Sequence, residues 1–281
     1  MTCDTWNPES DTPTSNLSAQ VGKSKAHDRC EHHTTTIEEA EAMSNAIHAA
    51  KKQLRLLVRQ RLAGLDQANL HAQSVAVTKK ILNDPIYQRA KRISIYISLP
   101  TSELRTDAII QDALSQNKKV FVPYIPPHKD SKMEMLHLKD EEEFASLIPN
   151  KWKIREFPHA AEPSTIFSER ENGLNVTTNQ GLDLILMPGL AFDRHLNRLG
   201  HGRGYYDTYL HRCALFSQQH NIERPKTIAL ALNEQILDEG QTIPAFTVED
   251  GHSSGHRDIK PDCILYPDGE LVLDVVEGSS S

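Results

Sequence analysis

Two patterns of apolar residues run along the chain, one typical of helices and one typical of buried strands. A helix is predicted over residues 45–66, where apolar residues recur every three or four positions. The residues that follow this spacing are Leu54, Leu57, Val58, Leu62 and Leu65. A second helix is predicted over 67–83 and ends before Pro85, because the residue preceding a proline disfavours helical geometry.

Nearly continuous apolar runs, rich in β-branched residues, predict strands that are buried on both faces. These strands are expected at residues 92–99, 119–125, 182–188, 226–232 and 262–267, with a possible short strand at 133–139. Helices are expected between them at 104–117 and 205–219, with a weak helix or turn at 141–144. The alternation predicts one α/β domain with a mostly parallel sheet flanked by helices, a Rossmann-like three-layer architecture.

The ends of the chain differ in composition from its middle. Residues 1–42 are rich in Ser, Thr, Asp and His and have no apolar period, which predicts a disordered N-terminal extension. The α/β domain is expected over 43–270, interrupted by a flexible insert at about 247–257. Residues 271–281 are expected to form a C-terminal tail.

Charge is distributed unevenly. The whole chain of 281 residues has a net charge of −7, whereas residues 47–239 carry a net charge of +4. A mildly basic body suits a small anionic ligand such as a nucleotide. The excess is too small for a nucleic-acid-binding surface, which needs a strongly basic domain.

The sequence also indicates a cellular compartment. It has no run of 18 apolar residues and therefore no expected membrane span. The N-terminus lacks an apolar core and contains Asp4, Glu9 and Asp11, which argues against a secretory signal and against a transit peptide. The four cysteines are scattered and form no CxxC pair, so neither a disulfide framework nor a zinc site is expected. We expect a cytoplasmic protein, and a mitochondrial pool stays an open alternative.

The segment "RLGHGRGYYDTYL" (198–210) is the strongest candidate for chemistry. It follows a predicted strand and opens a predicted helix, and ligands bind beyond the carboxyl ends of strands in open α/β sheets. Glycines allow close approach of the backbone, and a helix N-terminus favours anions. Arg198, His201 and Arg203 add charged donors, so we predict a phosphate site. The alternative is a tight strand–helix connection with solvated basic residues.

The helix after this loop contains three tyrosines and one aspartate with different expected roles. Tyr206 and Tyr209 share a stripe with Leu210 and Cys213, which favours a place in the core, whereas Tyr205 lies off the stripe and is available to a ligand. Asp207 stands in the first helical turn. Two roles stay open for it at this stage, a partner of the helix dipole and a ligand of Mg²⁺.

A longer segment, "MPGLAFDRHLNRLGHGRGYYDTYL", resembles the signature of the 5-formyltetrahydrofolate cyclo-ligase family. "AKKQLR" (50–55), "RISIYISLPTSELRT" and the closing "RDIKPDCILY" are also similar to segments of that family. The resemblance covers about residues 45–267. It implies conversion of 5-formyltetrahydrofolate to 5,10-methenyltetrahydrofolate with ATP and Mg²⁺, through an N5-iminium phosphate intermediate, with release of ADP and phosphate.

The resemblance also implies site residues, position by position. The ATP-binding residues would be Lys51, Lys52, Gln53, Leu54, Arg55, Arg198, Leu199, Gly200, His201, Gly202, Arg203, Gly204, Tyr205 and Tyr206. The folate-binding residues would be Ile97, Glu103, Trp152, His201, Gly202, Arg203, Gly204 and Tyr205. Asp207 and Asp258 would bind Mg²⁺, and Arg203 and Tyr205 would be catalytic. His201 is a departure, because many members of the family have Arg or Lys there.

Other functions remain possible from the sequence alone. One is a non-catalytic folate- or nucleotide-binding regulatory protein on the same scaffold, and another is a sugar-phosphate isomerase-like enzyme that would not need ATP. Without the resemblance, the residues favour a solvated helix face for Lys51 and Arg55 and a helix N-terminal acid for Glu103, and Trp152 fits a packing role equally well. We expect small-molecule partners only, no nucleic acid, no membrane, and a monomer.

Overall fold

The structure is a computed structural model. The described residues are 37–126, 132–151, 153–157, 166–167, 169–245 and 258–272. Within them, no helix is long and apolar enough to cross a membrane. Trp152 and the predicted insert at 247–257 lie outside the described residues.

Helices and short strands alternate along this part of the chain. The helices are α1 (Ile37–Ala63), α2 (Gln67–Leu82), α3 (Pro85–Arg89), α4 (Asp107–Ser115), α5 (Glu141–Ser146), α7 (Tyr205–His220) and the 3-10 turn η1 (Asn233–Gln235). The strands of the main sheet are β1 (Arg92–Ile95), β2 (Lys119–Tyr124), β3 (Glu134–Leu138), β6 (Leu184–Met187), β9 (Lys226–Leu230), β10 (Cys263–Tyr266) and β11 (Gly269–Val272). Two short hairpins are formed by β4 (Ile148–Pro149) with β5 (Arg155–Glu156), and by β7 (Ala191–Phe192) with β8 (Arg198–Leu199).

The seven-stranded sheet confirms the predicted α/β class. Its strand order is β11-β10-β9-β6-β1-β2-β3. The five strands from β10 to β2 are parallel, and the edge strands β3 and β11 are antiparallel to their neighbours. All four residues of β1 and all four of β6 are buried. These strands are central, which explains their continuous apolar sequences, because a central parallel strand is covered by other elements on both faces.

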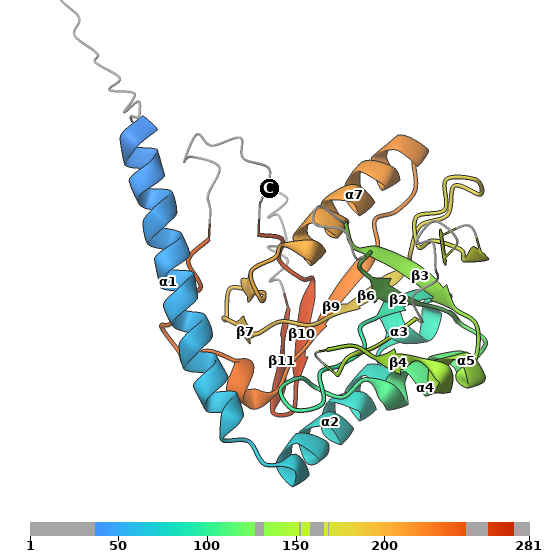
Figure 1. Ribbon diagram of the computed structural model, residues 1–281, viewed down its shortest axis with the longest axis horizontal. Helices are drawn as coiled ribbons and strands as arrows, with labels where there is room; N and C mark the ends of the chain where they lie inside the picture. The colour runs from blue at the N-terminus through green and yellow to red at the C-terminus, as the bar shows by residue number, and fades with distance from the viewer. Residues whose placement is uncertain are drawn as a thin grey trace, which may run out of the picture. The chain divides into compact units, whose positions relative to one another are not determined.

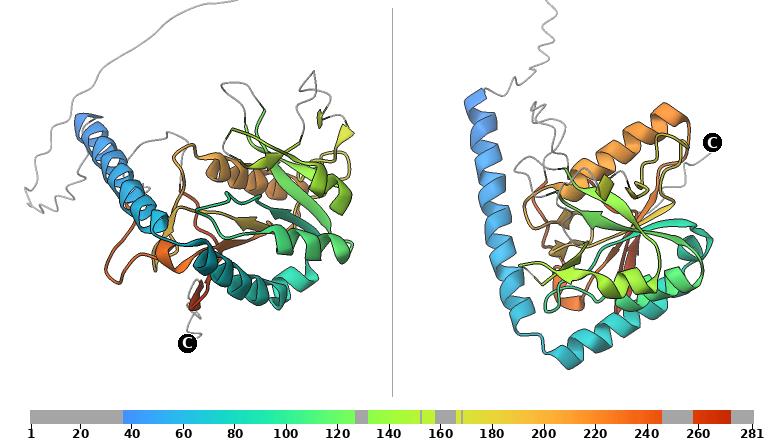
Figure 2. Two further views of the ribbon diagram at one scale, coloured as in Figure 1. Left: turned by 60° about the horizontal axis from the view of Figure 1, so that its bottom comes forward. Right: turned by 45° about the vertical axis from the view of Figure 1, so that its right-hand side comes forward.

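Helices cover both faces of the sheet and produce two apolar clusters (Figures 1 and 2). One cluster joins β1 residues such as Ile93 to Leu70 and Val77 of α2 and to Ile109 of α4. The other joins Ile185 of β6 to the α7 residues Tyr209, Leu210 and Cys213, with Phe121 and Ile264. The chain therefore has the three-layer arrangement that the alternating pattern predicts.

The structure corrects several details of these predictions. Helix α1 begins at Ile37, so residues 37–42 are helical and do not belong to a disordered extension. Leu57 is 40% exposed, whereas Val58 and Leu62 are buried. Adjacent residues lie about 100° apart round a helix, so Leu57 falls outside the stripe that Val58 helps to form. At the other end, strand β11 extends to Val272, beyond the expected domain end at residue 270.

Candidate functional site

The sheet reverses its winding direction between β1 and β6. From β1 the chain continues to β2 on one side, whereas β6, β9 and β10 lie on the other side. In open α/β sheets, ligands bind at such a switch point, beyond the carboxyl ends of the strands. The loop after β1 and the segment from Pro188 to Gly204 after β6 both lie at this position.

A buried turn connects β6 to the glycine loop. Gly189 has no room for a side chain, because a Cβ there would lie 2.3 Å from the Phe192 ring. The carboxylate of Asp193 is fully buried and accepts hydrogen bonds from the backbone N–H groups of His195, Asn197 and Ile243 at 2.8–2.9 Å. We did not predict a role for Asp193. The Phe-Asp pair in the family signature was the only signal in the sequence that could have indicated one.

The glycine loop ends where α7 begins, as predicted. Gly202 has φ +108° and Gly204 has φ +66°, conformations that residues with a Cβ rarely adopt. Gly204 is the N-cap of α7, and no side chain caps this helix end. The first N–H groups of α7 and the positive end of its dipole are consequently oriented toward the loop, which favours an anion.

Helix α1 lies against the glycine loop and contributes two basic residues to it. Arg55 Nε donates a hydrogen bond to the Gly200 carbonyl oxygen at 2.9 Å, and its guanidinium lies beside Gly202. Burial lowers the pKa of Arg55, as does the nearby charge of Arg59, whereas Asp258 raises it. Lys51 is buried and forms an ion pair with Asp258. Lys51 and Arg55 lie one turn apart on the same face of α1, so the structure places Arg55 on the loop and Lys51 beside Asp258.

The other residues of the predicted ATP-binding stretch on α1 have different positions. Lys52 and Gln53 are exposed, and Leu54 packs against the apolar cluster of α2 and β1. Leu199 of β8 is also buried in that cluster. The positions of these four residues, Lys52, Gln53, Leu54 and Leu199, do not support direct contact with a nucleotide.

The two proposed metal ligands lie close together. Both oxygens of Asp207 accept hydrogen bonds from Arg198 Nη2 at 3.0 Å. Asp207 Oδ1 also accepts a hydrogen bond from the backbone N–H of Ile259, the residue after Asp258. Among the described residues no three His, Cys, Asp or Glu side chains gather into a metal-binding group. A pair of carboxylates nevertheless fits Mg²⁺, which is commonly held by one or two carboxylates together with phosphates and waters.

Glu103, in the loop after β1, lies beside His201 of the glycine loop. Glu103 is buried, accepts a hydrogen bond from the Leu99 N–H at 2.8 Å, and has its Oε1 3.3 Å from His201 Nε2. The Thr106 hydroxyl donates to the Tyr96 carbonyl oxygen at 2.6 Å and holds this loop in shape. Ile97, also predicted to contact folate, is buried. The structure thus brings together residues from the loop after β1 and from the glycine loop, although Glu103 and His201 lie 98 positions apart.

The aromatic and basic residues around the start of α7 differ in their burial. Tyr209 is fully buried in the core, as predicted. The Tyr206 hydroxyl is buried and has no hydrogen-bond partner among the described residues, and burial followed by the charge of Glu103 raises its pKa. Tyr205 is only partly buried. Arg203 is exposed and makes no hydrogen bond within the described part of the chain.

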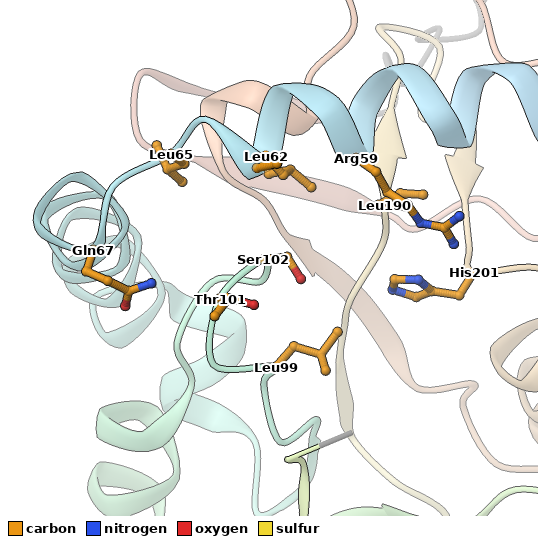
Figure 3. Close-up of a pocket in the computed structure, with 10 residues that line it drawn as sticks. Arg59, Leu62, Leu65, Gln67, Leu99, Thr101, Ser102, Leu190 and His201 are labelled. Carbon is orange, nitrogen blue, oxygen red and sulfur yellow. The ribbon is translucent and has the colours of Figure 1, made fainter. Parts of the chain in front are cut away.

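A pocket of about 520 Å³ opens beside Glu103 and the glycine loop. Figure 3 shows Arg59 and His201 on one side of this pocket and Gln67 on the other. Its walls combine apolar side chains, such as Leu62 and Leu99, with the hydroxyl groups of Thr101 and Ser102. Such a mixed lining is typical of small-molecule sites, in which a few polar groups fix the orientation of the ligand.

One known protein family has a sequence model that matches most of this chain. The model of the 5-formyltetrahydrofolate cyclo-ligase family matches residues 47–247. The chain belongs to this family. Membership makes the protein an enzyme, a ligase of folate one-carbon metabolism. The matched range includes α1 from residue 47 onward, the loop after β1 and the whole glycine loop.

Individual relatives agree with this assignment. The mouse (Mus musculus) 5-formyltetrahydrofolate cyclo-ligase is 39% identical over 222 residues, which cover 79% of this chain and 96% of the relative. A probable 5-formyltetrahydrofolate cyclo-ligase from Caenorhabditis elegans is 33% identical over 236 residues, covering 83% of this chain and all of the relative. The NMR structure of Aquifex aeolicus 5,10-methenyltetrahydrofolate synthetase has a TM-score of 0.57 at 21% identity, covers 82% of this chain and 95% of that one, and supports the fold alone.

Proposed function

We propose that the protein converts 5-formyltetrahydrofolate to 5,10-methenyltetrahydrofolate, with ATP as co-substrate and Mg²⁺ as the metal, and releases ADP and phosphate. The observation that carries this proposal is the convergence of α1 on the glycine loop. Lys51 and Arg55, about 150 positions earlier in the chain, lie where the loop and the N-terminus of α7 favour an anion. A polyphosphate is the ligand that this combination of donors suits best.

The nucleotide phosphates are proposed to bind along Arg198 to Tyr206, with Lys51 and Arg55 on the α1 side. Arg203 fits a role at the transferring phosphoryl group, because it is exposed on the loop and has no partner among the described residues that would have to be displaced. Tyr205, at the first position of α7, is proposed to lie between nucleotide and folate. Phosphoryl transfer depends mainly on positioning and on stabilisation of charge, and these residues offer both.

Asp207 and Asp258 would hold Mg²⁺. The fit rests on their adjacency through the Ile259 N–H and on the acceptor-only chemistry of carboxylates, which matches a hard cation. When bound, the metal would neutralise charge on the phosphate oxygens. The α7 dipole also favours a negative charge at Asp207, so the two roles considered for this residue are compatible.

Folate is proposed to bind at the pocket beside the loop after β1. Glu103 would accept hydrogen bonds from the pterin N–H groups, and the Leu99 N–H and His201 hold its carboxylate in place. Ile97 would support the ring by packing. Trp152, Gly202 and Gly204 complete the set that the family resemblance implies. The pocket lies between α1 and the loop after β1 and is lined by His201, which contacts Glu103, so a ligand there would lie next to phosphates bound on the glycine loop.

The proposed reaction needs no protein nucleophile. The formyl oxygen attacks the γ-phosphorus of ATP and ADP leaves, which gives an N5-iminium phosphate. N10 then attacks the activated carbon, the ring closes, and phosphate departs. The described cysteines are consistent with this route, because burial raises the pKa of both Cys213 and Cys263 to about 12 and keeps their thiols protonated.

The direct test is the absorbance of methenyltetrahydrofolate formed from 5-formyltetrahydrofolate, with ATP and Mg²⁺ omitted in turn. We expect product only when all three are present. Product without ATP would reject the proposed chemistry, and absence of product with intact nucleotide and folate binding would favour a regulatory binding protein. Turnover of a sugar phosphate without ATP would favour the isomerase alternative.

Glu103→Gln tests the folate site separately. Loss of a charged hydrogen-bond acceptor costs roughly 1.5–3 kcal/mol, so KM for 5-formyltetrahydrofolate should rise about ten- to a hundredfold. ADP affinity should stay unchanged. The matched control is Glu142→Gln, at an exposed position on α5.

We further propose that the protein works as a cytoplasmic monomer on small molecules, without nucleic-acid or membrane partners. Light scattering of the purified chain and fractionation of cells test these two points. A stable dimer, or co-fractionation with mitochondria, would require revision. The second outcome has a precedent in an Arabidopsis thaliana relative named as mitochondrial, which is 31% identical over 235 residues.

A further inference from the structure

Each of the two proposed metal ligands is paired with a cation that is proposed to bind phosphate. Lys51 of α1 forms an ion pair with Asp258, and Arg198 of β8 binds both oxygens of Asp207 at 3.0 Å. The Ile259 N–H bond to Asp207 joins the two pairs into one cluster. The residues that would bind metal and the residues that would bind polyphosphate are therefore occupied with one another.

Burial makes these pairs difficult to separate. The side chains of Lys51 and Arg198 are 7% and 5% exposed, and those of Asp258 and Asp207 are 29% and 15% exposed. A buried charge that loses its partner is strongly destabilised, because neither water nor another group replaces the lost interaction. Neither carboxylate can turn to a metal unless its cation finds another anion.

Each of the two ion pairs is balanced without any ligand, and Arg55, whose charged form Asp258 favours, adds a third cation near Asp258. A divalent metal alone would add two positive charges and take Asp258 and Asp207 away from Lys51 and Arg198. A polyphosphate alone would take the cations but would lie beside two unpaired carboxylates. When both ligands arrive together, each protein charge again has a partner of opposite sign.

Resting on the function proposed above, we propose that Lys51 and Arg198 close the metal site in the ligand-free protein. Metal and polyphosphate then bind by an exchange of partners, in which phosphate oxygens take Lys51 and Arg198 and the metal takes Asp258 and Asp207. Arg198 is suited to this exchange, because its buried Nε has no hydrogen-bond partner among the described residues and can donate to an incoming oxygen. Such coupling is reciprocal, so each ligand raises the affinity of the other by the same factor.

The test uses Mn²⁺ as a paramagnetic probe, with free and bound metal measured by electron paramagnetic resonance in the presence and absence of ADP. The wild-type protein should bind Mn²⁺ weakly alone, and ADP should raise its affinity by about 5- to 150-fold, the usual range of such coupling. Lys51→Gln leaves Asp258 without its cation and should bind Mn²⁺ alone more tightly than the wild type. Its gain from ADP should be smaller.

Arg61→Gln is the matched control. Arg61 lies on the same helix and also pairs with a carboxylate, Asp238, but at an exposed position. This variant loses one cation and one ion pair, as Lys51→Gln does, and its Mn²⁺ affinity without ADP should equal that of the wild type. An equal gain in both variants would mean that net charge alone controls metal affinity, and would overturn the proposal.

Asp258→Asn is a complementary variant that covers the case in which Lys51→Gln does not fold. It removes the carboxylate partner of Lys51, so ADP in EDTA should bind more tightly than it binds to the wild type. Weaker or unchanged ADP binding to folded Asp258→Asn, or wild-type Mn²⁺ binding that is equally tight with and without ADP, would overturn the exchange. A wild type that binds no ADP even with Mn²⁺ would instead reject the ATP-dependent function, whereas the comparison of Mn²⁺ binding without ADP would still decide whether Lys51 closes the metal site.

Discussion

Unlike the other arginines of the site, Arg203 does not stabilise the ligand-free fold through a hydrogen bond to the described residues. Arg198 and Arg55 each bind a protein acceptor, whereas Arg203 is exposed and makes no hydrogen bond within the described residues. Because α7 and the core do not depend on it, its replacement should affect ligands and leave the fold unchanged.

Arg203→Ala should therefore weaken binding of a non-hydrolysable ATP analogue about ten- to a hundredfold, since a charged hydrogen bond contributes roughly 1.5–3 kcal/mol. Calorimetric titration with the analogue and Mg²⁺ measures this loss, and a thermal melt checks that the fold is intact. Arg194→Ala, at an exposed position in the β7–β8 hairpin, is the control and should bind the analogue normally. Normal binding of the analogue by folded Arg203→Ala would remove Arg203 from the phosphate site.

Glu171 shows how one partly buried charge links stability to pH. Burial alone would raise its pKa, but hydrogen bonds from Lys119 and Arg92 lower the pKa to about 2. A carboxyl whose folded-state pKa is depressed stabilises the fold above its unfolded pKa of roughly 4.3, and this contribution disappears as the pH falls toward the folded-state value.

Glu171→Gln should accordingly be less stable than the wild type at pH 7, and the difference should shrink as the pH falls from about 5 toward 2. Urea unfolding at a series of pH values measures the free energies. Glu142→Gln, at an exposed position, should show little difference at any pH. A constant difference for Glu171→Gln across this range would mean that the ion pairs with Arg92 and Lys119 do not control the effect.

At the scale of elements, the β7–β8 hairpin decides where the glycine loop begins. Asp193 ties together the hairpin turn through His195 and Asn197, and it joins this turn to the segment after η1 through Ile243. Arg198 directly follows Asn197 and opens β8. A shift of the hairpin would therefore move Arg198 relative to Asp207 on α7.

Asp193→Asn should destabilise the protein by about 1–3 kcal/mol, because an amide NH₂ then faces buried N–H donors that need an acceptor. ADP affinity should fall as well, although Asp193 itself has no proposed contact with a ligand. Urea unfolding and ADP titration measure the two effects. Asp238→Asn removes an exposed carboxylate and should change neither quantity appreciably. A stability loss without any change in ADP affinity would show that the hairpin does not position Arg198.

Helix α1 is the other element that the site depends on, and it fulfils two roles at once. Val58 and Leu62 anchor its C-terminal half in the core, and Lys51 and Arg55 lie on the same helix face further toward the N-terminus, where Arg55 binds the glycine loop and Lys51 pairs with Asp258. Because the two basic residues are four positions apart, their side chains project from the same face of the helix. Packing of the apolar residues therefore sets the position of the charged ones.

For the whole molecule, we predict that the described body carries the activity. Residues 1–36 are polar and offer little apolar surface to bury, so a chain that begins at Ile37 should keep the melting temperature and turnover of the full chain. A chain that begins at Lys52 keeps Val58 and Leu62 but lacks Lys51, and it should lose most of its affinity for ADP. Thermal melts and ADP titration compare the three proteins. A large loss in the chain that begins at Ile37 would show that the first 36 residues contribute to the body.

Much of the local structure could be predicted because its causes are local. The continuous apolar runs of β1 and β6 identify central parallel strands, and the glycines before Tyr205 identify a loop that opens a helix. Leu57 marks the limit of this approach. Its spacing fits an amphipathic helix, but which face is covered depends on elements distant in sequence, and Leu57 remains 40% exposed.

The sequence by itself determined the class of fold, the glycine loop and the identity of the charged residues, because periodicity and turn chemistry act over a few positions. Only the tertiary structure decided that β6 lies beside β1, and thereby where the site forms. It also decided that Lys51 pairs with Asp258, 207 positions away, and Arg198 with Asp207. Such pairings follow from how the sheet and its helices pack, and no local pattern encodes which distant charge a buried side chain will meet.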